Sequence, residues 1–93
     1  MNPTSKKRSR WELIYDILKA THNGRFTKSR IMHKAYLDWR NFKKYFDLLI
    51  EEGFIARCDS SLDKYENTER GKKLLKQLRK VDETVGDSSV NRS

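Results

Sequence analysis

The chain has 93 residues, enough for one domain, and a formal net charge of +8 from 21 Lys and Arg residues against 13 Asp and Glu residues. Hydrophobic residues make up 35% of the chain and charged residues 37%, which is polar, but the 11% of aromatic residues argues against a fully disordered protein. No membrane span or signal peptide is evident, and the single cysteine, Cys58, excludes an internal disulfide, so we expect a cytoplasmic protein.

Residues 1–8 are polar and basic and are expected to form a flexible arm before a domain at residues 9–85. Ser9 and Glu12 stand at capping-box spacing, which predicts the start of a first helix. Asn23-Gly24 predicts its end. Apolar residues at helical spacing predict its inward face: Leu13, Ile14, Ile17 and Leu18, with Trp11 beside them.

Two further helices follow a short extended segment at residues 25–27. Thr27 is a suitable N-cap for a second helix from Lys28 to about Lys34. After a tight turn at Tyr36-Leu37, Asp38 caps a third helix that runs to about Glu52. The predicted inward positions are Ile31, Met32 and Ala35, then Phe42, Tyr45, Phe46, Leu49 and Ile50.

A β-hairpin is predicted after Gly53, which ends the third helix at a left-handed position. Residues 54–58 and 64–67 have the composition of two strands, separated by a polar loop at residues 59–63. The order helix, short strand, helix, helix, hairpin, helix predicts an α+β fold of the winged helix-turn-helix type. In that architecture the third helix enters the DNA major groove and the hairpin is the wing.

Thr68 caps the last helix, which is expected to run from Glu69 to about Val85, with a disordered tail at residues 86–93. Leu75 is expected to hold this helix on its own domain. A stripe at spacings of 3 and 4 residues predicts a seam with a second copy, although it can also pack on the first helix. The stripe consists of Gly71 and the proposed dimer-interface residues Leu74, Leu78, Val81 and Val85.

Several short motifs resemble one known family. They are Ser29-Arg30-Ile31-Met32, Ala35-Tyr36-Leu37-Asp38-Trp39, the spaced residues Phe42, Tyr45 and Leu49, Glu52-Gly53-Phe54-Ile55, and the run from Tyr65 to Leu75. Their order and spacing over residues 9–83 are similar to those of small archaeal winged-helix DNA-binding proteins. That family includes ten-kilodalton dimeric chromatin proteins and related predicted transcriptional regulators.

The resemblance implies sequence-tolerant binding of double-stranded DNA and a homodimer joined by the last helix. One departure concerns that helix. In the dimeric chromatin proteins it is long and forms an antiparallel coiled coil, whereas here the apolar pattern fades after Val85. The resemblance therefore supports the fold more strongly than it supports the dimer.

The basic excess lies in one half of the chain. Residues 1–50 contain 12 basic and 4 acidic residues, whereas residues 51–93 contain 9 of each. A one-sided basic surface favours a polyanionic partner, because neutralising phosphates releases condensed counterions. The alternative is a solvated, lysine-rich surface without a partner.

The third helix carries the main candidate DNA contacts between its inward positions. Asparagine and arginine can read adenine and guanine edges, and lysine can reach phosphates. Trp39, in its first turn, either packs on Leu37 and the second helix or stacks near the DNA backbone. The solvated candidates are Arg40, Asn41, Lys43 and Lys44; Asp47 shares their face.

Three other segments add candidate phosphate contacts. Lys28, Ser29 and Arg30 begin the second helix, where free backbone N–H groups suit a phosphate or simply receive a cap. The arm residues Lys6, Lys7, Arg8 and Arg10 either follow the DNA backbone or solubilise the chain. In the wing, Asp59 and Asp63 are expected to weaken binding by the two cations Arg57 and Lys64.

No catalytic motif is present, so we expect neither an enzyme nor a small-molecule substrate, and no cofactor. His22, His33 and Cys58 lie in separate elements without paired ligand spacing, so no metal site is expected. The rival interpretation is a winged helix that binds protein rather than DNA, although the cations of the third helix argue against it. RNA binding is disfavoured because no exposed aromatic platform is expected. The prediction is a nucleoid-associated, DNA-binding regulator or chromatin protein.

Overall fold

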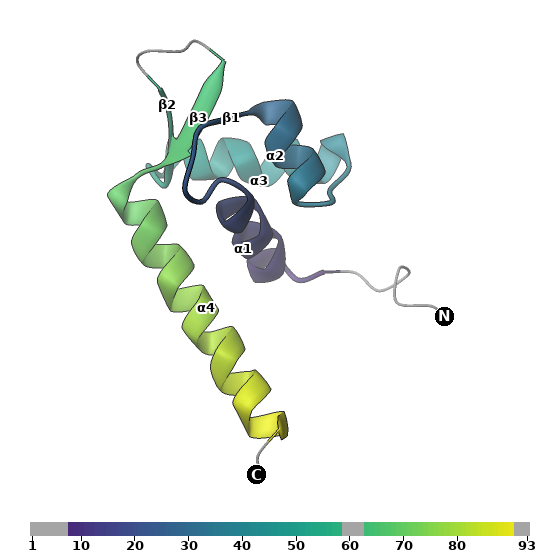
Figure 1. Cartoon of the computed structure of the whole chain (residues 1–93). Coiled ribbons are helices and arrows are strands. Elements are labelled where there is room, and N and C mark those ends of the chain that lie inside the picture. The colour runs from purple at the N-terminus through teal and green to yellow at the C-terminus, as the bar shows by residue number, and fades with distance from the viewer. Residues whose placement is uncertain (1–7, 59–62, 91–93) are drawn as a thin grey trace.

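The structure, a computed structural model, describes residues 8–58 and 63–90, with side chains as far as residue 80. Its elements follow the predicted order and confirm the α+β winged helix-turn-helix fold (Figure 1). They are α1 (Arg10–Ala20), β1 (Phe26–Thr27), α2 (Lys28–Lys34), α3 (Trp39–Glu51), β2 (Ile55–Arg57), β3 (Lys64–Asn67) and α4 (Glu69–Val90).

The predicted helix starts are formed by side-chain caps. The Ser9 hydroxyl accepts a hydrogen bond from the Glu12 backbone N–H at 3.1 Å, and the Ser9 N–H donates to the Glu12 carboxylate at 2.7 Å. Thr27 and Asp38 cap α2 and α3 in the same way, each accepting from a backbone N–H three residues ahead. Because these contacts are local, the sequence is sufficient to predict them.

The ends of two elements differ from the sequence prediction. The strand expected at residues 54–58 is one residue shorter at each end. At its start, the Phe54 N–H donates to the Leu49 carbonyl at 2.8 Å and closes the end of α3. In contrast, α4 continues through Gly86 to Val90, five residues beyond the predicted end. A helical glycine costs only about 1 kcal/mol relative to alanine, so it does not by itself stop a helix. Residues 91–93 lie outside the described residues.

The three strands form an antiparallel sheet in the order β1-β3-β2. The register pairs Phe26 and Arg57 with opposite sides of Tyr65, which places this residue at the centre of the sheet. Tyr65 is buried, and its ring meets the Phe46 ring edge-on at a centroid distance of 5.0 Å. The sheet therefore packs directly on α3.

The core lies between α1, α2, α3 and the sheet. Phe42 and Phe46 stack at 4.8 Å, and both are essentially inaccessible to solvent. The predicted inward positions are buried or pack partly against this core, but Trp11 is 56% exposed because it lies at the outer end of α1. The buried members are Leu13, Ile14, Ile17, Leu18, Ile31, Ala35, Phe42, Phe46 and Leu49, and the partly buried ones are Met32, Tyr45 and Ile50.

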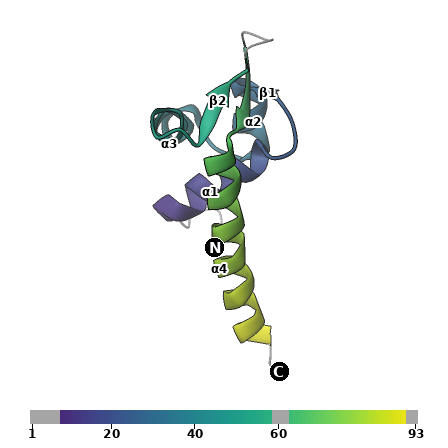
Figure 2. The same ribbon diagram turned by 90° about the vertical axis from the view of Figure 1, so that its left-hand side faces the viewer.

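Helix α4 packs along α1 and then runs past its end (Figures 1 and 2). Leu75 is buried, as expected for the residue that holds α4 on its own domain. However, Leu74 and Leu78 are also half-buried against the same core, so they are not reserved for a second copy. The predicted interface positions Val81 and Val85 lie in α4, but their side chains are outside the described residues.

Gly71 is the point at which α4 approaches the backbone of Phe54, between α3 and β2. It is buried, and a Cβ atom there would lie 2.1 Å from the Phe54 carbonyl oxygen. The Phe54 carbonyl also accepts a hydrogen bond from the Thr68 N–H at 3.0 Å, which fixes its position. Gly71 thus belongs to the packing within the domain rather than to the predicted seam.

We expect Gly71→Ala to lower the free energy of unfolding by about 1–3 kcal/mol, because the added methyl group overpacks a backbone contact. Urea unfolding followed by circular dichroism measures this change. Lys73→Ala, at an exposed position in the same helix, is the control and should change stability by no more than about 0.5 kcal/mol. Equal stability of the two variants would contradict the assigned role of Gly71.

Candidate nucleic-acid interface

The solvent face of α3 carries the predicted polar residues. The helix buries Phe42, Phe46 and Leu49, so the positions between them point away from the core. All four of the predicted contacts are exposed: Arg40, Asn41, Lys43 and Lys44. The Lys44 ammonium lies 5.4 Å from the centroid of the neighbouring Tyr45 ring. The Lys43 ammonium pairs with the Asp47 carboxylate at 2.8 Å, and both side chains are more than half exposed.

Charge is distributed unevenly along α3. Its cations lie in the first two turns, whereas Asp47 and Glu51 lie in the second half and Glu52 caps its end. The first turn contains no acidic residue and the last turn no basic residue. This order opposes the helix macrodipole, which favours acids at the N-terminus and cations at the C-terminus by about 0.3–1 kcal/mol each. The basic end of α3 is therefore not explained by helix stability.

A cleft at the base of the wing is lined by two of the predicted DNA-contact residues, which come from different elements. Lys28 and Arg57 line it with Phe46 and Tyr65, across from the acidic residues Asp47 and Glu51. The Lys28 ammonium lies 5.6 Å from the Phe46 ring centroid and 5.8 Å from that of Tyr65. Aromatic faces attract cations, so these rings hold the ammonium group beside the sheet. The cleft is mixed in charge, with the acids on the α3 side.

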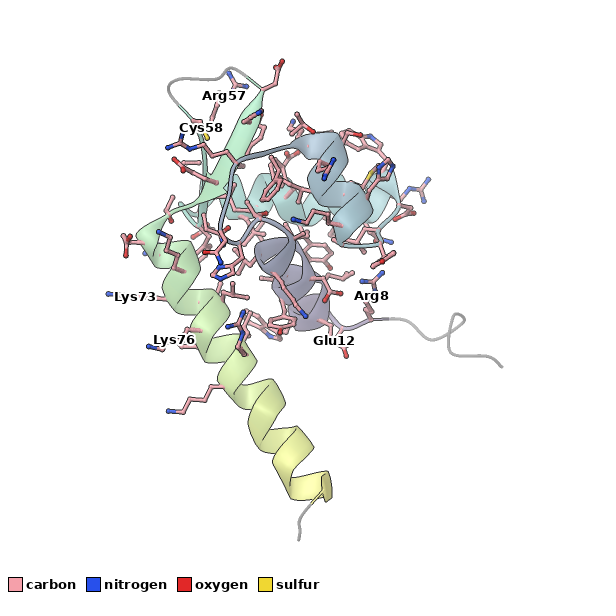
Figure 3. The ribbon with its side chains drawn as sticks, viewed as in Figure 1. Arg8, Glu12, Arg57, Cys58, Lys73 and Lys76 are labelled. Carbon is pink, nitrogen blue, oxygen red and sulfur yellow. The ribbon has the colours of Figure 1, made fainter. Side chains whose placement is uncertain are left out.

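Arg57 is an exposed cation near the wing (Figure 3). Its guanidinium donates to the Tyr65 hydroxyl at 3.4 Å and lies 5.8 Å from that ring's centroid. The hydrogen bond raises the pKa of Arg57, whose guanidinium is charged at neutral pH in any case. The predicted wing acid Asp63 is exposed, whereas Asp59 lies outside the described residues.

A second cleft, lined by three cations, lies along β1. Arg30 and Lys64, both predicted, line it together with Arg25, which sequence reasoning did not select. The Arg25 guanidinium is 3.3 Å from the Glu66 carboxylate, in an exposed pair. The strand register that pairs Thr27 with Lys64 brings these residues together, and no local pattern signals it. Ser29 is exposed but does not line this cleft.

Arg8 differs from the prediction of a flexible arm residue. Its guanidinium pairs with the Asp16 carboxylate at 2.5 Å and donates to the backbone carbonyls of Ala35 and Tyr36 at 3.0 and 2.5 Å. These acceptors come from α1 and from the turn between α2 and α3, so Arg8 connects the two (Figure 3). The other predicted contacts of the arm, Lys6 and Lys7, lie outside the described residues, and Arg10 is exposed at the start of α1.

Three described aromatic residues are exposed, although no exposed aromatic platform for unstacked bases was expected. For Trp39 the sequence left two alternatives open, packing on Leu37 and the second helix or stacking near the DNA backbone. Its described ring contact is with Phe42 in its own helix, at a centroid distance of 6.0 Å. It remains 50% exposed because the first turn of α3 extends beyond the edge of the core. Tyr36 in the turn is 86% exposed and Trp11 is 56% exposed. A lack of exposed aromatic residues therefore does not disfavour RNA binding.

The other candidate chemistry is weak in the part of the chain that the structure describes. Within residues 8–58 and 63–90, no three His, Cys, Asp or Glu side chains are grouped so as to hold a metal ion. Cys58 is buried at the end of β2. Among the described helices, none combines the length and apolar character needed to cross a membrane. On α4, Lys73 and Lys76 are exposed on the side away from α1 (Figure 3).

Comparison with known proteins agrees with this architecture. Two uncharacterized proteins of Methanocaldococcus jannaschii are similar in sequence. One is 50% identical over 72 residues, which cover 77% of this chain and 71% of the relative. The other is 36% identical over 77 residues, which cover 83% of this chain but only 35% of that longer protein.

The crystal structure of Sso10a-2, a DNA-binding protein from Sulfolobus solfataricus, superimposes with a TM-score of 0.70 at 25% sequence identity. The alignment covers 92% of this chain and 99% of Sso10a-2. The predicted resemblance to small archaeal winged-helix proteins is therefore confirmed. Residues 7–86 match the winged helix-turn-helix family, and the chain belongs to that family.

Proposed function

We propose that this protein binds double-stranded DNA and that the first two turns of α3 enter the major groove. The observation that carries the proposal is the exposed basic N-terminal half of α3, whose charges oppose the helix macrodipole. A bound polyanion would offset that unfavourable interaction, because phosphates attract both the cations and the positive N-terminal end of the helix dipole. The name of the structural neighbour Sso10a-2, a DNA-binding protein, supports the same class of partner.

The charge order of α3 suggests how deeply the helix is inserted. Phosphates would attract its N-terminal half and repel Asp47, Glu51 and Glu52 at its C-terminal end. In helix-turn-helix proteins the N-terminal residues of the recognition helix contact base edges. We therefore assign base contacts to Arg40 and Asn41, and a phosphate contact to Lys44.

The cleft at the base of the wing and the cleft along β1 would provide sequence-independent contacts. Arg25, Arg30 and Lys64 form the more basic cleft, which no described acidic residue lines, although Glu66 pairs with Arg25. Lys28 and Arg57 would contact phosphate at the base of the wing, although Asp47 and Glu51 weaken that site. Phosphate contacts fix the position of a protein on the duplex, whereas base contacts determine sequence preference.

The biological role consistent with these contacts is a transcriptional regulator or a chromatin protein of the nucleoid. A protein-binding winged helix is the competing interpretation. The exposed cations of α3 favour DNA over a protein surface, and a titration with duplex DNA distinguishes the two.

Binding should depend steeply on salt, because it would rely on phosphate contacts. If each subunit neutralises roughly four to six phosphates, the logarithm of the affinity should fall against the logarithm of salt concentration with a slope of about −4 to −5 per subunit. Fluorescence anisotropy with a mixed-sequence duplex at several salt concentrations measures this slope. A salt-independent affinity, or no binding at low salt, would contradict the proposal.

Substitutions in α3 should separate base contacts from phosphate contacts. Arg40→Ala or Asn41→Ala should reduce discrimination between a preferred and a random duplex by about 1–3 kcal/mol. Lys44→Ala should weaken binding to both duplexes equally. Lys76→Ala, an exposed cation of α4, is the matched control and should change little. If none of the three α3 variants alters binding to any duplex, α3 is not the DNA-contacting helix.

We further propose that the protein is a homodimer whose seam is formed by α4. The support is the apolar spacing that continues from Leu78 to Val81 and Val85, in a helix that runs beyond α1. Because Leu74 and Leu78 also serve the core, the seam would depend most on the part of α4 beyond residue 80. Two joined domains bind neighbouring half-sites at high effective concentration.

Val85→Glu should disrupt this dimer without unfolding the domain, because an unpaired carboxylate is strongly disfavoured in an apolar seam. We expect the unmutated protein to sediment as a dimer with a dissociation constant in the micromolar range or weaker. The variant should sediment as a monomer with unchanged circular dichroism and bind DNA less tightly. Gln77→Glu adds the same charge at an exposed position of α4 and is the control. A monomer at a few hundred micromolar unmutated protein would refute the seam.

A further inference from the structure

Tyr36 has an unusual backbone conformation for a large residue. Its φ is +57°, in the left-handed region, where a Cβ atom crowds the following carbonyl. The other described residues with positive φ are Asn23 and Gly53, the two residue types that tolerate this conformation. A tyrosine at this position is therefore unfavourable for the fold, and it needs another explanation.

The strained turn is held in place by its backbone rather than by the tyrosine ring. The Tyr36 N–H donates to the His33 carbonyl at 3.1 Å, and the Leu37 N–H donates to the Met32 carbonyl at 3.2 Å. Arg8 binds the Tyr36 carbonyl from the other side. The side chain remains 86% exposed, so core packing does not offset the strain. The fold thus presents the ring to solvent at a rigid point of the chain.

The surroundings of Tyr36 indicate what the ring contacts. It lines an open cleft of about 520 Å³ together with Arg8, Arg40 and Asn41 at the start of α3. The acidic residue that lines the cleft, Asp38, accepts the Asn41 N–H as the helix cap. The ring therefore lies beside Arg40 and Asn41, which the proposed function assigns to DNA. An acidic polymer suits these neighbours better than a neutral protein surface does.

We propose that Tyr36 is a DNA-contact residue whose ring packs on the deoxyribose-phosphate backbone at the edge of the groove that α3 enters. This assignment rests on the proposed function. The left-handed turn directs the ring outward, next to Arg40, and the hydrogen bonds of Arg8 keep it there. Because the sugar-phosphate backbone is common to all sequences, the contact adds affinity without sequence preference.

Tyr36→Asn tests the contact, because asparagine tolerates the left-handed conformation but lacks the ring. We expect about tenfold weaker binding to preferred and random duplexes alike, with a thermal unfolding midpoint equal to or above that of the unmutated protein. Tyr36→Phe keeps the ring and should bind within about twofold of the unmutated protein. Trp11→Asn removes another exposed aromatic residue, which does not line the cleft, and should leave the affinity unchanged.

These outcomes distinguish failure of the contact from failure of the proposed function. If the unmutated protein binds no duplex, both fall. If it binds and Tyr36→Asn binds equally well, only the Tyr36 contact is overturned. Equal losses in the Phe and Asn variants would assign the contact to the hydroxyl group and overturn ring packing.

Chemical protection gives a second measurement that needs no variant. Tetranitromethane nitrates accessible tyrosines, and Tyr36 is far more exposed than Tyr15, Tyr45 or Tyr65. We expect Tyr36 to be the first tyrosine nitrated in the free protein and to react at least several-fold more slowly in complex with duplex DNA. Peptide mass spectrometry measures both rates. An unchanged rate for Tyr36 in the complex would overturn the proposal.

Discussion

The contact between α3 and the sheet is the interaction on which the rest of the structure depends. Phe42 and Phe46 stack within the helix, and the edge-on contact between the Phe46 and Tyr65 rings joins the helix to the central strand. Aromatic pairs of this kind add about 0.5–1.5 kcal/mol beyond the burial of their area. More importantly, they fix the angle of α3 to the wing. Any binding surface formed by α3 and the wing together therefore depends on these ring contacts.

The same rings also position charge. Lys28 lies near the faces of Phe46 and Tyr65, and Arg57 contacts Tyr65 from the neighbouring strand. The Phe46 and Tyr65 rings therefore hold two cations from separate elements beside α3. An ammonium or guanidinium group over a ring stays solvated on its other side, so both side chains remain available to an anion.

Tertiary packing also explains how α3 tolerates an unfavourable charge order. Helices in proteins gain most of their stability from a packed apolar face rather than from local preference. With Phe42, Phe46 and Leu49 fully buried, the exposed face of α3 can carry cations at the wrong end of the dipole. Similarly, the turn at Tyr36 accepts a strained backbone because Arg8 and the ends of α2 constrain it from both sides. The charge order of α3 and the strained turn at Tyr36 both lower the local stability of the fold. Both lie at the surface that would face the proposed partner.

The sequence alone determined the order of elements, the helix starts and most of the core. These features depend on local contacts, such as the Ser9–Glu12 capping box, and on the apolar periodicity that separates Phe42 and Phe46 from Arg40 and Lys43. Local signals also indicated which face of α3 is solvated. They were less reliable at the end of α4, because a helix that meets neither proline nor a strong cap can continue past an isolated glycine.

Only the tertiary structure decided which surface residues lie together. Arg25, Arg30 and Lys64 share a cleft because β1 pairs with β3 across more than thirty residues of sequence, in a register that no local pattern specifies. Arg8 belongs to the domain because its guanidinium finds acceptors 27 and 28 residues away. The exposure of Trp39 and Tyr36 likewise depends on where the core ends. Contacts between distant segments follow from how the helices and strands pack, and a pattern read along the chain contains no information about that packing.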